Sequence, residues 1–429
     1  MRTKKFRKTI FACMVATILV LGLSTGAFVQ GADEYDEEVD ECTTVIALGI
    51  ATVDGNTRTG QTSDGLARAT GLTPTRIVSI TVDEGTGIKS IGGALNDQGV
   101  TAQHNGRRPL PGMKGRSDTW ADANEAYIVE YAFVRADNPD AFWSSSRKAL
   151  AAAHTAKEAV DIYVAGLPEG SYWIIGPLKN QAYGHANAYI APELLSSQID
   201  ATYSRNRGQR AHDLLQERNS WKNATESAVW GEISSLYLFG ILRTHDTQWG
   251  FDSTWTFYYE ESGNICRWGH DAISSIGTVS EVNAEYPDML SIYWCAPAFP
   301  AFCPFLPFFI GQDEIPPAFA DGNANESDIF RELFSAISYK MDYADDVQGF
   351  WESFDHQTVS ELMFFNGDVK ALLKDGDTKE AKQLLYNFSN AKSELAISYA
   401  KELVNLIVEG RPISDMRIDT SLPNRPTWK

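Results

Sequence analysis

Histidine and cysteine are scarce in this sequence, with seven histidines and five cysteines among 429 residues. No His-Glu-x-x-His run, no paired Cys-x-x-Cys and no phosphate-binding glycine loop occurs. These patterns are the usual sequence signs of zinc and nucleotide sites. The sequence therefore predicts no metal and no cofactor.

Basic residues are outnumbered by acidic ones. Lys and Arg total 37 against 56 Asp and Glu, which gives a formal net charge of −19 at pH 7. A protein of this charge repels phosphate backbones and anionic lipid, so we expect neither nucleic acid nor an anionic membrane as a partner. Core residues are plentiful, since the chain is 43% hydrophobic and 11% aromatic, and this composition is typical of a large folded core.

The N-terminus has the pattern of a secretory signal peptide. A basic region at residues 2–8 precedes an apolar run at residues 10–23, and small residues follow at 24–27. We expect cleavage near Gly31 or Ala32 and a secreted or otherwise extracytoplasmic protein. Because the apolar run is long for a signal peptide, an uncleaved membrane anchor remains the alternative.

The chain is expected to have three parts. Residues 1–31 form the signal peptide, residues 32–41 form an acidic propeptide too polar to pack, and residues 42–429 form one folded domain. No internal repeat and no long linker divides this last part, although its length would also allow two ordinary domains.

Cys42 stands out among the cysteines by its position. Cys13 lies in the signal peptide, whereas Cys42 follows the acidic propeptide and heads an apolar stretch. If the bond between Glu41 and Cys42 were cut, this residue would carry both a thiol and a free α-amine. The remaining cysteines form an odd set in which at most one disulfide can form: Cys266, Cys295 and Cys303.

An N-terminal cysteine can catalyse acyl transfer with its own two groups. The α-amine titrates near neutral pH, at about 7.7–8.0 in model peptides, so it can accept the proton of the thiol. The alternative for Cys42 is a buried structural cysteine, which is the usual state of this residue type.

The domain begins with strands. Residues 42–48 are rich in Val, Ile, Leu and Thr, and Asp54-Gly55 is a strong hairpin signal. Strands first, then helices, strands and helices again predict an α+β layered domain. Helices are expected at residues 120–130, at residues 144–163 and, as a terminal pair, at residues 381–408.

Two stretches carry a family pattern. Cys-Thr-Thr-Val-Ile-Ala-Leu-Gly-Ile-Ala-Thr-Val-Asp-Gly at residues 42–55 and Gly-Gln-Thr-Ser-Asp at residues 60–64 resemble the start of mature N-terminal nucleophile (Ntn) hydrolases of the cysteine type. They are similar to dipeptidase A-like peptidases and to isopenicillin N acyltransferase-like enzymes, which cleave themselves before such a cysteine. The resemblance implies a four-layered αββα fold, with two antiparallel sheets between helices, and cleavage of linear amides through a thioester.

Later stretches fit the same families. Residues 93–100 resemble a Gly-x-Asn-Glu-x-Gly turn with aspartate in place of glutamate, and residues 185–187 resemble a Thr-Asn-His turn. Ala188 stands where a histidine is common, and Ser204-x-x-Arg207 fits a Ser-x-x-Arg motif. The resemblance runs from Cys42 to about residue 409.

The resemblance and the chemistry of amide cleavage suggest catalytic roles. Asn187 is expected to donate a hydrogen bond to the oxyanion formed when Cys42 attacks an amide, with Asn96 as the second choice. Asp64 is expected to hold the α-ammonium group and to raise its pKa. For each of these residues the alternative is an ordinary part in a turn or a cap.

Substrate contacts are expected from Gln61, Arg207 and Asn96. Many dipeptidase relatives have arginine at the position of Gln61, so recognition of the substrate differs here. Arg207 can bind a substrate carboxylate through two hydrogen bonds, and a salt bridge on the surface of a helix is its alternative.

The sequence thus predicts a secreted, self-processing cysteine hydrolase that cuts between Glu41 and Cys42 and then acts on a small-molecule amide or dipeptide. An acyltransferase of the same superfamily is one alternative, and a non-catalytic exported binding protein that retains the fold is another. Assembly into a homo-oligomer is left open by the sequence.

Overall fold

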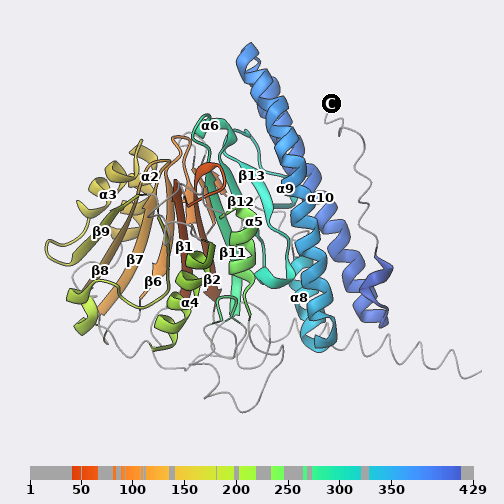
Figure 1. Ribbon diagram of the computed structural model, residues 1–429, viewed down its shortest axis with the longest axis horizontal. Helices are drawn as coiled ribbons and strands as arrows, with labels where there is room; N and C mark the ends of the chain where they lie inside the picture. Colours follow the sequence, from red (N-terminus) through yellow and green to blue (C-terminus); the bar gives the residue numbers. More distant parts are fainter. Residues whose placement is uncertain are drawn as a thin grey trace, which may run out of the picture. The chain divides into compact units, whose positions relative to one another are not determined.

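A computed structural model of the chain (Figure 1) shows an α+β domain with two antiparallel sheets and C-terminal helices. The α+β class predicted from the order of the elements is confirmed. The structure describes residues 41–49, 51–65, 81–83, 88–91, 93–107, 110, 113–134, 141–179, 181–197, 202–218, 233–245, 264–267, 273–319 and 328–416.

The first sheet is built around the N-terminal hairpin. β1 (Glu41–Gly49) and β2 (Gly55–Gly65) lie in its interior, in the strand order β10-β1-β2-β11-β12-β13. The hairpin predicted at Asp54-Gly55 is therefore present. The other strands are β10 (Ala182–His185), β11 (Ile273–Val282), β12 (Ile292–Ala296) and β13 (Leu306–Phe309).

The second sheet is an antiparallel meander in which the strands follow chain order from β3 to β9. It contacts the first sheet, with β6 against β1 and β2 and with β5 against β11. Its strands are β3 (Thr81–Asp83), β4 (Ile88–Ile91), β5 (Gly93–Leu95), β6 (Thr101–Gly106), β7 (Met113–Ala121), β8 (Ala126–Val134) and β9 (Tyr172–Leu178).

The helix predicted at residues 120–130 is wrong. Trp120 belongs to β7, and the chain reverses at Asp122, whose side chain accepts hydrogen bonds from the backbone N–H of Asn124 at 2.7 Å and of Glu125 at 3.1 Å. An aspartate bonding to the backbone two residues on is a turn signal. The aromatic and β-branched residues of β8 then fit a strand that is buried on both faces.

The helix predicted at residues 144–163 is divided in two. α2 (Ala141–Ala152) ends before Thr155, whose side chain accepts a hydrogen bond from the N–H of Glu158 and so caps α3 (Ala156–Val164). Within the described ranges, the other helices before the C-terminal part are α4 (Thr202–Arg218), α5 (Ser235–Arg243) and α6 (Pro287–Leu290), with short 3₁₀ turns η2 (Pro192–Ser197), η4 (Pro300–Phe302) and η5 (Pro317–Phe319).

Helices cover both sheets. α3 contacts β7 and β8 of the second sheet, while α4 contacts β1 and β10, and α5 contacts β2 and β11, of the first sheet. Figure 1 shows α4 and α5 running along the strands of the N-terminal hairpin. Val45 and Ala47 share a hydrophobic cluster with residues of α4 and α5, whereas Ile46 and Leu48 cluster with residues of β7 and β8. By this alternation along β1, Cys42 lies on the face directed toward the second sheet.

The end of the domain is a helical hairpin. α8 (Ile329–Tyr339) leads through η6 (Met341–Tyr343) to α9 (Ala344–Asp375) and α10 (Thr378–Glu409), followed by η7 (Ile413–Asp415). The prediction of a helix pair within residues 381–408 is therefore wrong, because this range lies in the single helix α10, whose partner is α9. Gly376 and Gly410 end the two helices with φ of 84° and 73°, a conformation that glycine adopts without strain. Among the residues described, no helix combines the length and the apolar character needed to cross a membrane.

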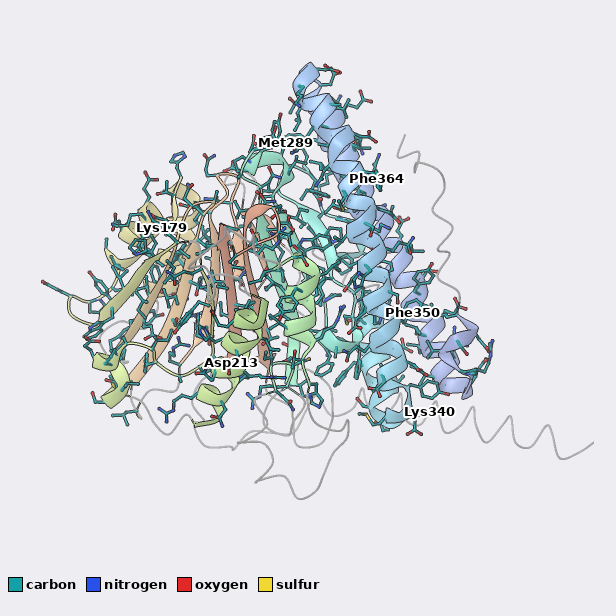
Figure 2. All side chains as sticks on the ribbon, viewed as in Figure 1. Lys179, Asp213, Met289, Lys340, Phe350 and Phe364 are labelled. Atoms are coloured by element: carbon teal, nitrogen blue, oxygen red, sulfur yellow. The ribbon has the colours of Figure 1, made fainter. Side chains whose placement is uncertain are left out.

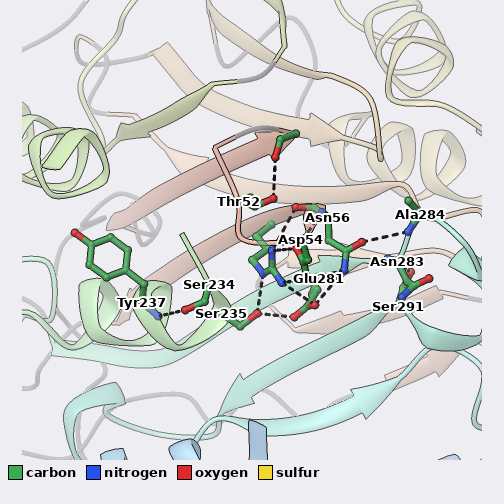
Figure 3. A network of polar contacts seen from close by, with 12 residues as sticks. Thr52, Asp54, Asn56, Ser234, Ser235, Tyr237, Glu281, Asn283, Ala284 and Ser291 are labelled. Atoms are coloured by element: carbon green, nitrogen blue, oxygen red, sulfur yellow. Dashed lines mark hydrogen bonds and ion pairs between the residues drawn. The ribbon is translucent and has the colours of Figure 1, made fainter. Parts of the chain in front are cut away.

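A partly buried polar network holds the turn of the N-terminal hairpin (Figure 3). Arg58 forms ion pairs with Asp54 at 2.7 Å and with Glu281 of β11 at 2.9 Å. Burial alone would raise the pKa of Asp54, but the hydrogen bond and the charge of Arg58 lower it overall. Because this network joins the turn to β11, it helps to hold the register in which Cys42 lies opposite Ser63.

Candidate active site

Cys42 is the second residue of β1, and its side chain is 1% exposed. In the antiparallel register it pairs with Ser63 of β2, and the Cys42 Sγ lies 3.8 Å from the Ser63 Oγ. The thiol thus lies at the beginning of an interior strand, on the face directed toward the second sheet. This is where the sequence predicted a nucleophile.

Three polar side chains hold the backbone of Cys42. Its N–H donates to the Oδ1 of Asn187 at 3.1 Å, and its carbonyl oxygen accepts from the Nδ2 of Asn105 at 3.2 Å and from the Nη2 of Arg207 at 3.4 Å. Asn105 comes from β6, Asn187 from the loop after β10 and Arg207 from α4. All three side chains are buried, so the residue with the candidate nucleophile is fixed on both sides.

The orientation of the Asn187 amide follows from its neighbours. Its Oδ1 accepts from the Cys42 N–H and from Arg207, while its Nδ2 donates to the Oδ1 of Asn105 at 3.0 Å and to the carbonyl of Gly106 at 2.8 Å. Asn187 therefore lies beside Cys42, and its oxygen accepts a hydrogen bond from the backbone of this residue. In this arrangement it orients the nitrogen atom that cleavage would convert into the α-amine.

Asn105 was missed by the sequence analysis. Its Nδ2 donates to the Cys42 carbonyl and, at 3.4 Å, to the Oγ1 of Thr44, and its Oδ1 accepts from Asn187. The sequence pattern that could have indicated it is the pair Gln103 and Asn105, two polar residues spaced two apart and therefore on the same face of a strand. Both are fully buried here, and polar side chains on the inner face of a strand indicate a polar network.

An ion pair supports the loop that carries Asn187. Arg107 lies 2.6 Å from Glu130 of β8, and both side chains are 0% exposed. Arg107 also donates to the carbonyl of Ala186, and Glu130 accepts from the backbone N–H of Ile190 at 2.8 Å and of Ala191 at 2.7 Å. The pair thus binds the loop on both sides of Asn187, and no sequence pattern indicated it.

His185 lies two residues before Asn187 and is held neutral. Burial and the positive charge of Arg107 lower the pKa of His185 well below its ordinary value. The Nη2 of Arg107 lies 3.3 Å from the Nδ1 of His185, and the Oγ1 of Thr119 lies 3.1 Å from its Nε2. Since an arginine can only donate, Nδ1 is the acceptor and Nε2 carries the proton.

We expect this neutral histidine to make stability depend on pH. The folded pKa lies below the ordinary value of 6.5, so the free energy of unfolding falls as the pH drops below that value. One such group contributes up to about 1.4 kcal/mol per pH unit until the folded pKa is reached. The measurement is urea unfolding between pH 7.5 and 4.5 for the wild type and for His185→Asn, which lacks the titrating ring.

The control for this experiment is His154→Asn, because His154 is exposed at the start of α3. This variant measures the effect of replacing an exposed imidazole by an amide. A pH profile of His185→Asn that stays parallel to that of the wild type would show that His185 does not contribute to the pH dependence.

Gln61 and Asn96 have other contacts. The amide of Gln61 donates to the carbonyl of His104 and accepts from its N–H at 3.1 Å, so it joins the two sheets. Asn96 Nδ2 donates to the carbonyls of Leu150 and Ala153, and its Oδ1 accepts from the N–H of Val100 at 2.8 Å. The structure does not bring either side chain to Cys42, and their roles in substrate binding remain predictions.

The expected cleavage site lies in paired backbone. Glu41 and Asp64 are opposite each other in the β1–β2 register, one position before and one position after the Cys42–Ser63 pair. The backbone of Asp64 also pairs with that of Ser274. The side chains of Glu41 and Asp64 lie outside what the structure describes, so their roles stay predictions, and residues 1–40, for which the sequence predicts a signal peptide and most of a propeptide, are not described either.

A second polar cluster lies between the second sheet and its helices. The Nδ1 of His104 is 2.8 Å from Asp118 Oδ1, and its Nε2 is 3.2 Å from the Oγ of Ser146 on α2. Tyr163 of α3 donates to the other oxygen of Asp118. His104 lies on the same face of β6 as Ala102. Ala102 belongs to a hydrophobic cluster that also contains residues of α2 and α3. The cluster satisfies polar groups in that core and is not part of the Cys42 site.

Cys295 and Cys303 are unsuited to nucleophilic attack. Cys266, Cys295 and Cys303 are present as buried thiols, and burial raises the pKa of Cys295 and Cys303 far above the ordinary range. No group of three or more His, Cys, Asp or Glu side chains that could hold a metal ion occurs within the described ranges.

No protein-family model matches this chain, and no curated protein matches it either. The Cys42 thiol lies at the start of an interior strand, and two asparagines and a buried arginine hold the backbone of the same residue.

Proposed function

We propose that this chain is an exported cysteine hydrolase of the N-terminal nucleophile class, which cuts itself before Cys42 and then hydrolyses a linear amide or dipeptide. The observation that carries the proposal is the convergence of Asn105, Asn187 and Arg207 on the backbone of Cys42. These residues come from three separate elements, and their buried polar groups are directed at one residue. A merely structural cysteine needs no such support.

The fold that we propose is the four-layered αββα arrangement. The contacts of α4 and α5 with the first sheet, of α3 with the second sheet and of the two sheets with each other support it. In such an arrangement the nucleophile lies at the end of an interior strand, where a residue on the inner face can be reached from the edge of the sheets.

Self-processing begins with attack of the Cys42 sulfur on the carbonyl carbon of Glu41. The new carbon–sulfur bond and collapse of the tetrahedral intermediate break the bond to the Cys42 nitrogen, which takes up the proton released by the thiol. The product is a thioester, and water hydrolyses it to a carboxylate on Glu41 and a free thiol. Asn187 keeps its oxygen on the Cys42 nitrogen throughout, at 3.1 Å in the uncut chain.

Turnover reuses the same two groups. The free α-amine accepts the thiol proton, the sulfur attacks the substrate carbonyl, and the amine returns the proton to the departing nitrogen of the substrate. Water then resolves the acyl-Cys42 thioester. Asn105 and Arg207 hold the Cys42 carbonyl during these steps, so the nucleophile keeps its position while its acyl group changes.

The test is N-terminal sequencing with intact mass for the wild type and Cys42→Ala. We expect the wild type to begin at Cys42 and the variant to retain residues upstream, because it lacks the attacking sulfur. Cys295→Ala is the matched control, since it removes a buried thiol from the same sheet and should mature like the wild type. If wild type and Cys42→Ala both begin near Asp33, no free amine is formed and the proposed mechanism is wrong.

Matured protein then distinguishes a hydrolase from a binding protein. A thiol-directed acyl probe should label Cys42 once per chain at neutral pH, and Cys42→Ala should stay unlabelled. Correctly matured protein without labelling would favour an exported binding protein that retains the fold. Release of the probe to an added amine, in preference to water, would favour acyl transfer.

A further inference from the structure

Ser63 contacts the candidate nucleophile from the neighbouring strand. Ser63 and Cys42 face each other in the antiparallel register of β1 and β2, and residues paired in this way have Cβ atoms about 4.5–5.5 Å apart. The Cys42 thiol donates to the Ser63 hydroxyl, with 3.8 Å between Sγ and Oγ. Arg207, by contrast, bonds to the backbone of Cys42 from α4, the helix that Asp213 marks in Figure 2. Ser63 therefore contacts the atom that reacts.

A β-bulge lies on the other side of Ser63. The register of β11 against β2 shifts between Ser274 and Ile276, so Ser275 is an extra residue opposite the last residues of β2. The Ser275 side chain is buried, and its hydroxyl donates to the carbonyl of Ser63 at 3.1 Å. Bulges are over-represented next to active sites, where they redirect a side chain. This bulge adds a hydrogen bond to the residue that contacts the sulfur.

Ser63 is fixed in its backbone but accessible in its side chain. Its strand β2 lies between β1 and β11, so both edges of the backbone are paired. The Ser63 side chain is partly exposed, whereas Gln61 on the same face of β2 is buried. The hydroxyl that accepts from the buried thiol thus belongs to the more accessible end of this face.

A serine hydroxyl can stabilise both forms of a neighbouring thiol. It accepts from S–H in the neutral form, and because its hydrogen rotates it can donate to the thiolate. Hydrogen bonds with an ionised partner are about twice as strong as neutral ones, so the hydroxyl favours the thiolate overall. The thiolate is the form of cysteine that attacks a carbonyl carbon.

The uncut chain has the greatest need of such a hydroxyl. Before cleavage the Cys42 nitrogen belongs to a peptide bond, and its N–H donates to Asn187. A backbone N–H is a donor and not a base, so the α-amine that serves turnover does not yet exist. The group that favours the thiolate in the first reaction has to come from elsewhere in the fold.

We infer that Ser63 is a further catalytic residue of this site, whose hydroxyl holds the Cys42 sulfur in place and stabilises its thiolate during self-processing. The inference rests on the proposed function, because it assigns a role within the same reaction. Ser275 is a positioning residue that acts through the carbonyl of Ser63. The register matters as well, because a slip of one residue would turn Ser63 to the opposite face of the sheet.

Ser63→Ala should slow self-processing by about 10-fold or more, which is the effect of losing one hydrogen bond to a charged group. It should also move the midpoint of the pH profile for alkylation of Cys42 by iodoacetamide upward, by about 0.5–1 pH unit. Ser63→Thr keeps a hydroxyl and suits a strand, so it should restore most of both properties. Mass spectrometry follows the appearance of chains that begin at Cys42 and locates the alkylation in the peptide that contains Cys42.

The matched control is Ser280→Ala. Ser280 is a fully buried serine of the same sheet, and its hydroxyl lies 3.5 Å from the Nε2 of Gln103. This variant should leave the processing rate and the alkylation midpoint unchanged. A role of Ser63 in packing alone would slow processing without moving the midpoint, and Ser63→Thr would then not restore the rate. That result would overturn the inference.

The wild type separates failure of this inference from failure of the proposed function. If the wild type is cut before Cys42 while Ser63→Ala keeps both its processing rate and its alkylation midpoint, the inference about Ser63 is wrong and the proposed function stands. If the wild type is not cut, the proposed function is wrong. The alkylation profile of the uncut chain then still decides whether Ser63 stabilises the thiolate.

Discussion

Asn187→Ala is expected to slow self-processing by about 100-fold or more, because misplacement of a reacting group by about 1 Å has effects of this size. The substitution removes the acceptor of the Cys42 N–H and a partner of both Asn105 and Arg207. The nitrogen of Cys42 then loses the contact that orients it. The measurement is the rate at which chains beginning at Cys42 appear, followed by mass.

Asn187→Asp separates the two functions of this amide. It keeps an oxygen acceptor for the Cys42 N–H and for Arg207, and it loses the Nδ2 donor that faces Asn105 and Gly106. If orientation of the Cys42 nitrogen is the main function, Asn187→Asp should process much faster than Asn187→Ala. If both variants are equally slow, donation by Nδ2 to Asn105 and Gly106 is the main function.

Asn96→Ala is the matched control for Asn187→Ala. Asn96 is also a buried asparagine that satisfies backbone groups, but it does so in the turn between β5 and β6 and at the end of α2. Its loss should lower the free energy of unfolding without changing the processing rate well below the melting temperature. Equal slowing by Asn96→Ala would mean that the effect of Asn187→Ala reflects general destabilisation.

The sequence was informative where one local pattern determines a structure. The hairpin at Asp54-Gly55 depends on a turn signal within the hairpin itself, and the strand that begins at Cys42 is a short β-branched run. The helix expected at residues 120–130 was wrong because a side-chain turn at Asp122 and strand pairing on both sides outweigh local helical spacing.

The candidate site was predictable only in part, for a similar reason. Cys42, Asn187 and Arg207 could be proposed together because a family resemblance linked them, and the structure brings them into contact. The roles of Asn105 and of the ion pair between Arg107 and Glu130 could not be proposed from the sequence, because they depend on which strands become neighbours. A single sequence does not contain that information as a local pattern.

The ion pair of Arg107 and Glu130 makes the loop of Asn187 part of the core. A loop on its own would be poorly ordered, and its backbone groups would need water. Here Glu130 satisfies two backbone N–H groups and Arg107 a carbonyl. The position of Asn187 beside Cys42 is thus coupled to the stability of the second sheet, because Glu130 belongs to β8.

Glu130→Ala is therefore expected to have the largest effect on stability, lowering the free energy of unfolding by about 3–5 kcal/mol, as removal of one partner of a buried ion pair does. It leaves Arg107 charged in the core and removes the acceptor of two backbone N–H groups. Urea unfolding measures this change, and we expect slower self-processing as well, because the Asn187 loop loses its support.

Two further variants show whether the cost comes from the unpaired charge. Asp161→Ala breaks an ion pair with Lys157 in which the Lys157 side chain is 52% and the Asp161 side chain is 57% exposed. Because the pair is exposed, this change should lower the free energy of unfolding by no more than about 1 kcal/mol. Arg107→Met combined with Glu130→Leu removes both charges, so it should recover much of the stability lost by Glu130→Ala. It should not recover the processing rate, because the hydrogen bonds to the loop are still missing. If Glu130→Ala costs as little as Asp161→Ala, the loop is held by its packing and not by the ion pair.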